Sequence, residues 1–196
     1  FFTPKVIRAV VKIIFLWYTE LKRCNLCAAG IRRVCKGRFY MQDIYYEQIQ
    51  YSEPGINGDF AMIVCYDLMG IKSETVPHWH KALEVTLPLE NSLLVTEDGN
   101  LREVPEGKVL CINSRTVHIT KGKDKTRYSR GIVVVLSEEL LFSLCPDFEQ
   151  LWFSLPPDSP AQPELVAVME ELYRCKMHPT PYIQGRINSL LYQLCY

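Results

Sequence analysis

Apolar and polar residues alternate in short runs through the part of the chain that follows Met41. Every second residue from Leu83 to Leu89 is apolar, which leaves Glu84 and Thr86 on the opposite face of a predicted strand. Further β-favouring runs, separated by turn signals such as Asp98-Gly99, occupy residues 60–68, 93–96, 101–104, 108–112 and 128–136. This pattern predicts a mainly β fold over residues 41–145, an antiparallel double-sheet barrel of the jelly-roll kind.

The pattern changes to helices and prolines after Ser137. Ser137 is a suitable N-cap for a short helix, and Pro146 would end that helix. Residues 146–163 are rich in proline and are predicted to form a bridge. Residues 164–196 then carry two apolar stripes at helical spacing, so we expect two or three α-helices after the barrel.

The two apolar stripes suggest a partner for the helix pair. Such short helices are not stable alone, and their stripes offer more apolar surface than one face of a small barrel is expected to cover. We therefore predict a homodimer whose interface contains Leu165, Val168, Leu172, Ile183, Ile187, Leu190 and Leu194. The second stripe is still running at Tyr196, so we expect the segment 164–196 to be truncated and the natural protein to continue.

Charge divides the chain into two unlike parts. The 22 Lys and Arg residues balance the 22 Asp and Glu residues, yet residues 1–40 contain nine of the basic residues and one acid, Glu20. A basic end of this kind is compatible with a nucleic-acid arm or a targeting segment. We favour translated upstream sequence, because the chain begins with Phe and its first methionine is Met41. Arg8 and Lys12 interrupt the apolar run near the start, which argues against a membrane span.

Three histidines and a glutamate are the candidate chemistry of the chain. His78 and His80 point to the same face if they lie in a strand, Glu84 follows four residues later, and His118 comes from a distant segment. Imidazole and carboxylate groups that meet in one place suit a divalent metal or a polar ligand. In the alternative interpretation the imidazoles are packed structural groups and Glu84 faces water. The residues alone leave both interpretations open.

The spacing H-x-H-x3-E and the later histidine resemble the cupin signature. The second half of that signature, G-x5-P-x-G-x2-H, is matched at Gly107 and His118, with Asn113 and Arg115 where Pro and Gly usually stand. A barrel followed by a proline-rich bridge and an apolar helix pair resembles the N-terminal sensor half of AraC-type transcription regulators. The sequence His-Trp-His-Lys at residues 78–81 is also similar to sequences of that family.

The regulator resemblance covers residues 60–196 and implies an effector-sensing and dimerisation domain of a bacterial AraC-type transcriptional regulator, which is not an enzyme. In such regulators the barrel binds a small polar metabolite, often a sugar, and C-terminal helix-turn-helix motifs read DNA. Those motifs are missing from this sequence, so DNA contact would need a further domain. The expected compartment is the cytoplasm, because the cysteines after Met41 stand singly among apolar neighbours, as in reduced proteins.

In the sensor interpretation the effector is held by His78, His80, Glu84 and His118, with Trp79 as a wall. The runner-up is a metal-dependent cupin enzyme, a dioxygenase or an isomerase, whose divalent cation is bound by the same histidines and glutamate. No catalytic residue is assigned, and no cofactor apart from that metal. A sugar site would also offer amide, guanidinium and aromatic groups, and the sequence does not fix which of Tyr45, Tyr66, Asn113 and Arg115 point inward.

Overall fold

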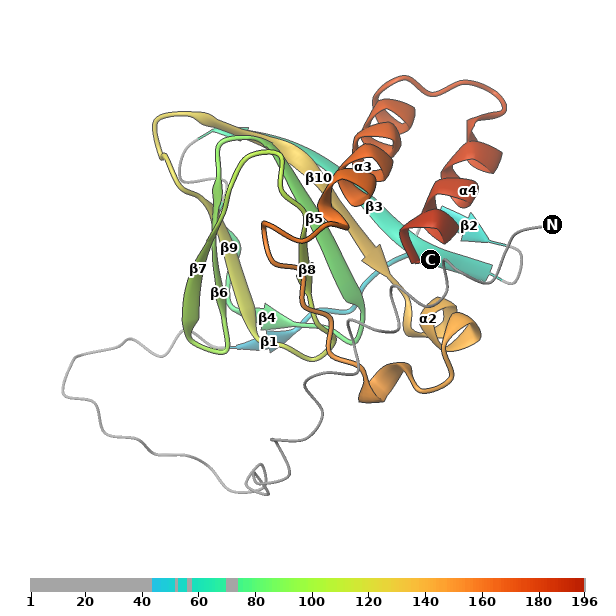
Figure 1. Cartoon of the computed structure of the whole chain (residues 1–196), viewed down its shortest axis with the longest axis horizontal. Coiled ribbons are helices and arrows are strands. Elements are labelled where there is room, and N and C mark those ends of the chain that lie inside the picture. Colours follow the sequence, from blue (N-terminus) through green and yellow to red (C-terminus); the bar gives the residue numbers. More distant parts are fainter. Residues whose placement is uncertain (1–43, 52, 56–57, 70–73, 196) are drawn as a thin grey trace. The chain divides into compact units, whose positions relative to one another are not determined.

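The computed structural model describes residues 44–51, 53–55, 58–69 and 74–195, all within the structural unit Gln42–Tyr196 (Figure 1). The basic extension 1–40 lies outside the described residues, so its interpretation stays a prediction. Among the residues that the structure describes, no helix combines the length and the apolar character needed to cross a membrane.

Ten strands form two five-stranded sheets in the described part of the chain. The first sheet has the order β1 (Tyr45–Tyr46), β4 (His78–Trp79), β9 (His118–Gly122), β6 (Leu93–Glu97) and β7 (Asn100–Val104). The second has the order β2 (Glu53–Gly55), β3 (Gly58–Met69), β10 (Tyr128–Leu136), β5 (Leu83–Glu90) and β8 (Leu110–Ile112). All strand pairs are antiparallel except β1 and β4. The predicted fold class, a mainly β antiparallel double-sheet barrel, is therefore confirmed.

The hairpin between β6 and β7 forms where the sequence predicts it. Glu97 pairs with Asn100, and the two residues between them have φ values of 46° at Asp98 and 84° at Gly99. Both values lie in the left-handed region that a two-residue hairpin loop requires. Asp98 also accepts a hydrogen bond from the backbone N–H of Val117, which ties this turn to the segment before β9.

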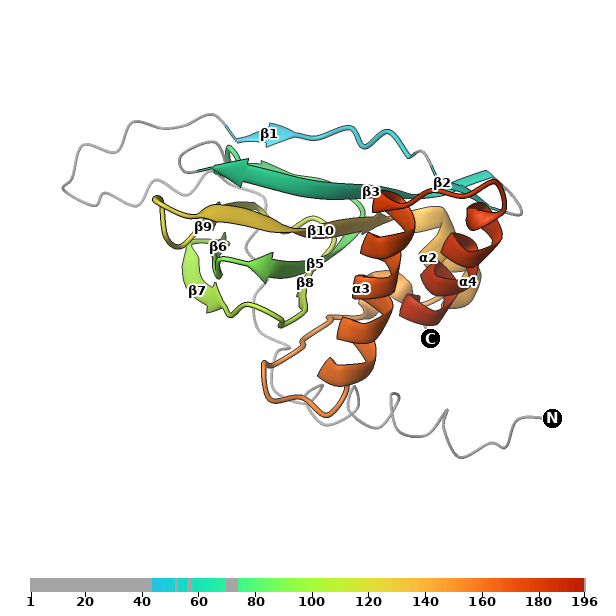
Figure 2. The same ribbon diagram turned by 90° about the horizontal axis from the view of Figure 1, so that it is seen from above.

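Three α-helices and one 3-10 turn follow the barrel: α2 (Glu138–Leu144), η2 (Phe148–Gln150), α3 (Gln162–Met177) and α4 (Ile183–Cys195). The hydroxyl of Ser137 accepts a hydrogen bond from the N–H of Leu140 at 3.1 Å, so Ser137 caps α2 as predicted. Helix α3 begins at Gln162, so the last two residues of the predicted bridge are helical. Helices α3 and α4 lie side by side next to β3 and β10 (Figures 1 and 2).

The proline-rich bridge is bound along the outer edge of β8 by two side-chain amides. The Gln162 amide accepts from the N–H of Val109 and donates to its carbonyl, both at 2.9 Å. The Asn113 amide does the same with Phe153, at 2.7 and 2.8 Å. Val109 and Asn113 flank β8, so the bridge covers what would otherwise be an open edge strand.

The second sheet has two faces with different partners. Residues that pair across neighbouring strands point to the same side of a sheet, and successive residues alternate. Leu83, Val85 and Leu87 of β5 therefore share a face with Ile132 and Val134 of β10, and these residues form one core with the helices. Glu84 and Thr86 point the other way, into the barrel.

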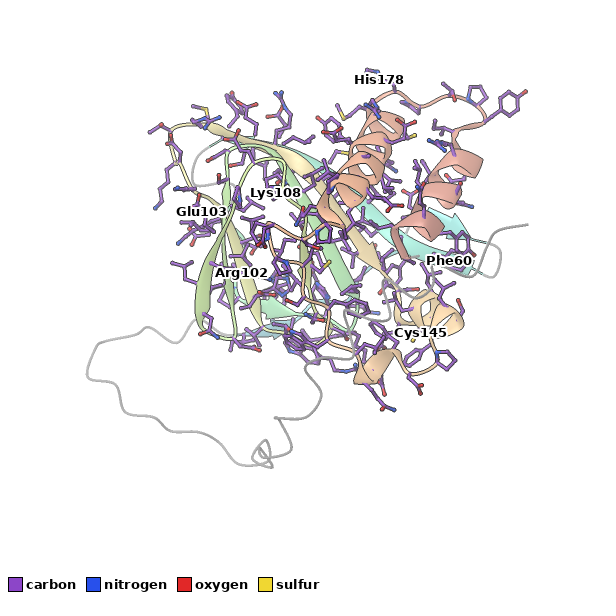
Figure 3. The ribbon with its side chains drawn as sticks, in the orientation of Figure 1. Phe60, Arg102, Glu103, Lys108, Cys145 and His178 are labelled. Atoms are coloured by element: carbon purple, nitrogen blue, oxygen red, sulfur yellow. The ribbon has the colours of Figure 1, made fainter. Side chains whose placement is uncertain are left out.

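The predicted interface residues are instead packed within their own chain. Leu190 of α4 is 2% exposed and Leu172 of α3 is fully buried, because the apolar outer face of the second sheet covers both helices. Figure 3 shows the labelled Phe60 of β3 near α4, and its ring lies 5.8 Å from that of Tyr192. Buried or partly buried in the same way are Leu165, Val168, Ile183, Ile187 and Leu194. The assignment of this stripe to a dimer seam is therefore wrong, and self-association itself stays a prediction.

Candidate metal centre

Four of the predicted site residues meet inside the barrel. His78 lies on β4, His80 follows that strand, Glu84 lies on β5 and His118 lies on β9. One nitrogen or oxygen atom from each residue falls within 4.8 Å of the others, and no residue of the four is more than 8% exposed. The pairing of His78 with His118 brings the two sequence segments together. The alternative in which Glu84 faces water is wrong.

The three imidazole rings are all held in the same way. Each Nδ1 lies near the backbone carbonyl oxygen of a residue two positions away, at 2.7 Å for His78, 3.2 Å for His80 and 3.0 Å for His118. A carbonyl oxygen only accepts, so Nδ1 carries the hydrogen and Nε2 of a neutral ring has a free lone pair. Backbone contacts of this kind fix ring orientation and leave Nε2 to bind a metal.

The Glu84 carboxylate faces two of these lone pairs. Its Oε2 atom lies 3.4 Å from Nε2 of His80 and 3.5 Å from Nε2 of His118, while Oε1 accepts a hydrogen bond from Thr86 at 2.9 Å. With neutral rings, only acceptors face one another in the cluster. A positive charge must therefore lie between them, either a proton on an imidazole or a cation.

Protons partly satisfy this requirement in the metal-free site. Burial alone would raise the pKa of Glu84, but the neighbouring His118 and His80 outweigh it and hold that pKa well below its ordinary value. Burial would lower the pKa of His118, but the Glu84 carboxylate raises it above the ordinary value. Burial lowers the pKa of His78, so that ring stays neutral near pH 7. The site thus contains a carboxylate, a basic imidazole and at least one neutral ring.

One ligand atom remains without a hydrogen-bond partner. Within the described chain, Nε2 of His118 is buried and has no hydrogen-bond partner, because its ion-pair contact with Glu84, at 3.5 Å, is long for a hydrogen bond. Buried polar atoms rarely lack a hydrogen-bond partner, and one common explanation is that the site binds an ion. Imidazole nitrogens with a carboxylate oxygen suit divalent transition metals. The residues present therefore fit a metal ion.

A second carboxylate, Glu47, approaches the cluster from the segment that contains β1. Its Oε2 atom lies 3.3 Å from Nε2 of His78, and its backbone N–H donates to the carbonyl of Trp79 at 2.9 Å. The Tyr45 ring is stacked beside the His78 ring at 6.0 Å. Sequence reasoning missed Glu47, because no spacing signal links residues 45–47 to the histidines. Only the parallel pairing of β1 with β4 reveals the contact.

The remaining candidate residues have different surroundings. The Trp79 ring lies 4.8 Å from that of Tyr46, and its role as a wall of the site stays a prediction. Asn113 binds the bridge, and Arg115 forms ion pairs at 2.6 and 2.9 Å with carboxylates of α2 and η2. Arg115 has a φ of 63°, so it occupies the left-handed conformation at the place where the cupin signature has glycine. Tyr66 points into the barrel.

Comparisons with known proteins give resemblance only at the level of overall shape. No family model matches the chain, and no curated protein matches its sequence. A cupin superfamily protein from Desulfitobacterium hafniense has a TM-score of 0.37 and 15% identity, covering 41% of this chain and 71% of its own. The Schizosaccharomyces pombe Cnp3 cupin domain has a TM-score of 0.39 and 11% identity, covering 49% and 66%.

The same search finds an enzyme. A mutant of Bacillus subtilis oxalate decarboxylase has a TM-score of 0.35 and 20% identity, over 40% of this chain and 21% of the enzyme. That decarboxylase contains Mn(II) centres. At such low scores and partial coverage the likeness carries no information about activity.

Proposed function

We propose that the barrel is a metal-containing sensor domain of a bacterial AraC-type transcriptional regulator, which binds a small polar metabolite. The observation that supports it is the convergence of three imidazoles and the Glu84 carboxylate, with Nε2 of His118 left without a hydrogen-bond partner among the described residues. A divalent cation held by His78, His80, Glu84 and His118 would supply a positive charge that attracts an oxygen atom of the effector. The regulator role itself derives from the sequence resemblance.

A metal-dependent cupin enzyme is the second candidate, and Glu47 is the observation that favours it. This carboxylate is 39% exposed at its side chain, and it lies beside His78 without belonging to the four-residue cluster. A partly exposed carboxylate next to a metal-binding histidine is suitably placed to move a proton to or from a bound molecule.

Metal content tests the part that both candidates share. Purified wild-type protein should contain close to one equivalent of a divalent transition metal by mass spectrometry of the dissolved ions. The His80→Ala protein should lose most of that metal while it keeps a cooperative thermal transition. His178→Ala is the matched control, because His178 is exposed beyond the end of α3 and should leave the metal unchanged. Equal metal in all three proteins would refute the centre.

A metabolite screen on the metal-loaded protein then separates the two candidates. Compounds that raise the melting temperature are incubated with the protein and recovered for mass spectrometry. A sensor returns its effector unchanged, whereas an enzyme converts it. For a ligand at about 100 times its dissociation constant, the expected stabilisation is roughly 2.7 kcal/mol. Conversion that persists in Glu47→Gln would remove the proton-transfer role from Glu47, and conversion by the wild type would refute the sensor.

A further inference from the structure

A second polar group faces the barrel interior on the sheet that carries Glu84. Tyr66 of β3 pairs with Gly131 of β10, which in turn pairs with Pro88 of β5. Pro88 is four residues from Glu84, so Tyr66 and Glu84 point to the same side of the sheet. At about 3.3 Å per residue, the two positions are about 13 Å apart along the strands, before the side chains reach toward each other.

The Tyr66 hydroxyl is buried and has no hydrogen-bond partner among the residues that the structure describes. The hydroxyl end of the phenol lies over Gly131, because a Cβ atom at Gly131 would be 2.5 Å from the hydroxyl oxygen and 2.7 Å from the Cζ atom that carries it. Glycine at this position is what allows the ring to enter the barrel. A buried hydroxyl without a partner destabilises a protein, so its presence calls for a reason.

The surroundings of Tyr66 are apolar and accessible. Val64 and Leu68 flank it on the same face of β3, and they are 41% and 40% exposed although they face the barrel side of the sheet. Burial raises the pKa of Tyr66, with a smaller contribution from the charge of Glu84, so the hydroxyl keeps its proton and can donate. Along the sheet, Val64 and Val133 lie in the row between Glu84 and Tyr66, whereas Leu68 lies beyond Tyr66. The path from the metal-binding cluster to the Tyr66 hydroxyl therefore passes apolar side chains.

We propose that the Tyr66 hydroxyl is the second anchor of the ligand site in this barrel. The ligand class is a short aliphatic acid with a metal-binding carboxylate at one end, an apolar middle and a neutral oxygen acceptor at the other end. The far oxygen is neutral because no cationic side chain of the described residues is paired with Tyr66. The carboxylate end of this inference rests on the proposed metal centre, whereas the Tyr66 end does not.

The test is a cycle of two proteins and two sets of probes. The wild type and Tyr66→Phe, both loaded with metal, are titrated calorimetrically with unbranched carboxylates from butanoate to octanoate and with their ω-hydroxy counterparts. The wild type should bind at least one ω-hydroxy acid about ten-fold more tightly than the plain acid of the same length, about 1.4 kcal/mol. Tyr66→Phe should bind the two alike. An equal preference in both proteins, or no binding by a metal-loaded wild type, overturns the proposal.

Thermal unfolding of the metal-free proteins tests the hydroxyl without any ligand. Tyr66→Phe should melt at a higher temperature than the wild type, because it removes a buried polar atom that has no partner. Tyr128→Phe is the matched control, since Tyr128 is 49% exposed on β10 and should change nothing. A lower melting temperature for Tyr66→Phe would show a structural hydrogen bond and overturn the inference. Metal content measured on the same samples shows separately whether the metal centre itself has failed.

Discussion

The substitution Leu190→Glu tests whether helices α3 and α4 pack in the core of their own chain or form an interface with a second chain. Leu190 is 2% exposed, at the centre of the contact between α4 and the rest of the core. If the stripe were an exposed seam, the substitution would dissociate a dimer and leave the fold intact. Because the stripe is covered by its own barrel, we expect the substitution to unfold the protein instead.

The expected magnitude follows from the burial of this side chain. Truncation of a buried leucine to alanine costs about 2–5 kcal/mol, and an unpaired carboxylate in the same place costs several kcal/mol more. Domains of this size are stable by about 5–15 kcal/mol in total. A loss of about 3 kcal/mol in Leu190→Ala, with a urea slope of about 2 kcal/mol per molar, would lower the midpoint by about 1.5 M. Leu190→Glu should retain little or no folded protein.

Urea denaturation followed by tryptophan fluorescence measures these changes, with sedimentation on the same samples. Ser189→Glu is the matched control, because Ser189 is the exposed neighbour on the same helix and should shift the midpoint little. The reasoning is refuted if Leu190→Glu has the wild-type midpoint. If Leu190→Glu sediments differently from the wild type but has the same urea midpoint, the stripe is an interface between two chains.

Three further outcomes are expected. Metal affinity should fall as the pH is lowered from 8 to 6. Glu84 raises the pKa of His118, so a proton competes with the metal ion for Nε2 of that ring. An affinity that does not change with pH in metal titrations would exclude His118 as a ligand. Arg115→Gly should be more stable to urea than Arg115→Ala by about 1 kcal/mol, because both lose the same ion pairs but only glycine relieves the positive φ; equal stability would refute this strain. Cys111 and Cys195 are partly buried, and desolvation raises the pKa of both thiols to about 12, so both should be alkylated slowly at pH 8 until urea unfolds the protein; labelling at the rate of a free thiol would contradict this desolvation.

The strands were predictable wherever alternation was strong. The last long strand has the bounds expected from the sequence, and Glu84 lies on the face that the apolar pattern of its neighbours leaves free. The common direction of His78 and His80 was predictable from the rule that residues two apart share a face of a strand, although β4 ends at Trp79. The approach of His118 depends on the pairing of β4 with β9. A short strand such as β1 has no such signal, because two residues cannot show a period. Glu47, the residue after β1, could be placed only by the pairing of β1 with β4 in three dimensions.

The partner of the helices could not be predicted, because the sequence does not state how many faces of a sheet are covered. An apolar row on β5 serves equally well as the lining of a barrel or as the floor beneath a helix. On β5 the side that faces the barrel interior carries Glu84 and Thr86, and the apolar row faces the helices. The same ambiguity applied to Tyr66 and Asn113. Tyr66 points inward, whereas Asn113 is used by the bridge.

Neighbouring residues of strand β5 face two different environments, and this restricts which mutations the strand tolerates. Leu83 and Val85 contact the helix side, while Glu84 between them belongs to the metal cluster. Insertion or deletion of a single residue upstream in this strand would exchange the two sides, placing a carboxylate among the helices and leucines among the histidines. Natural variants should therefore show substitutions here but no length changes. Strand β7 lies at the edge of its sheet and its residues 100–103 are exposed, so it should tolerate both substitutions and length changes.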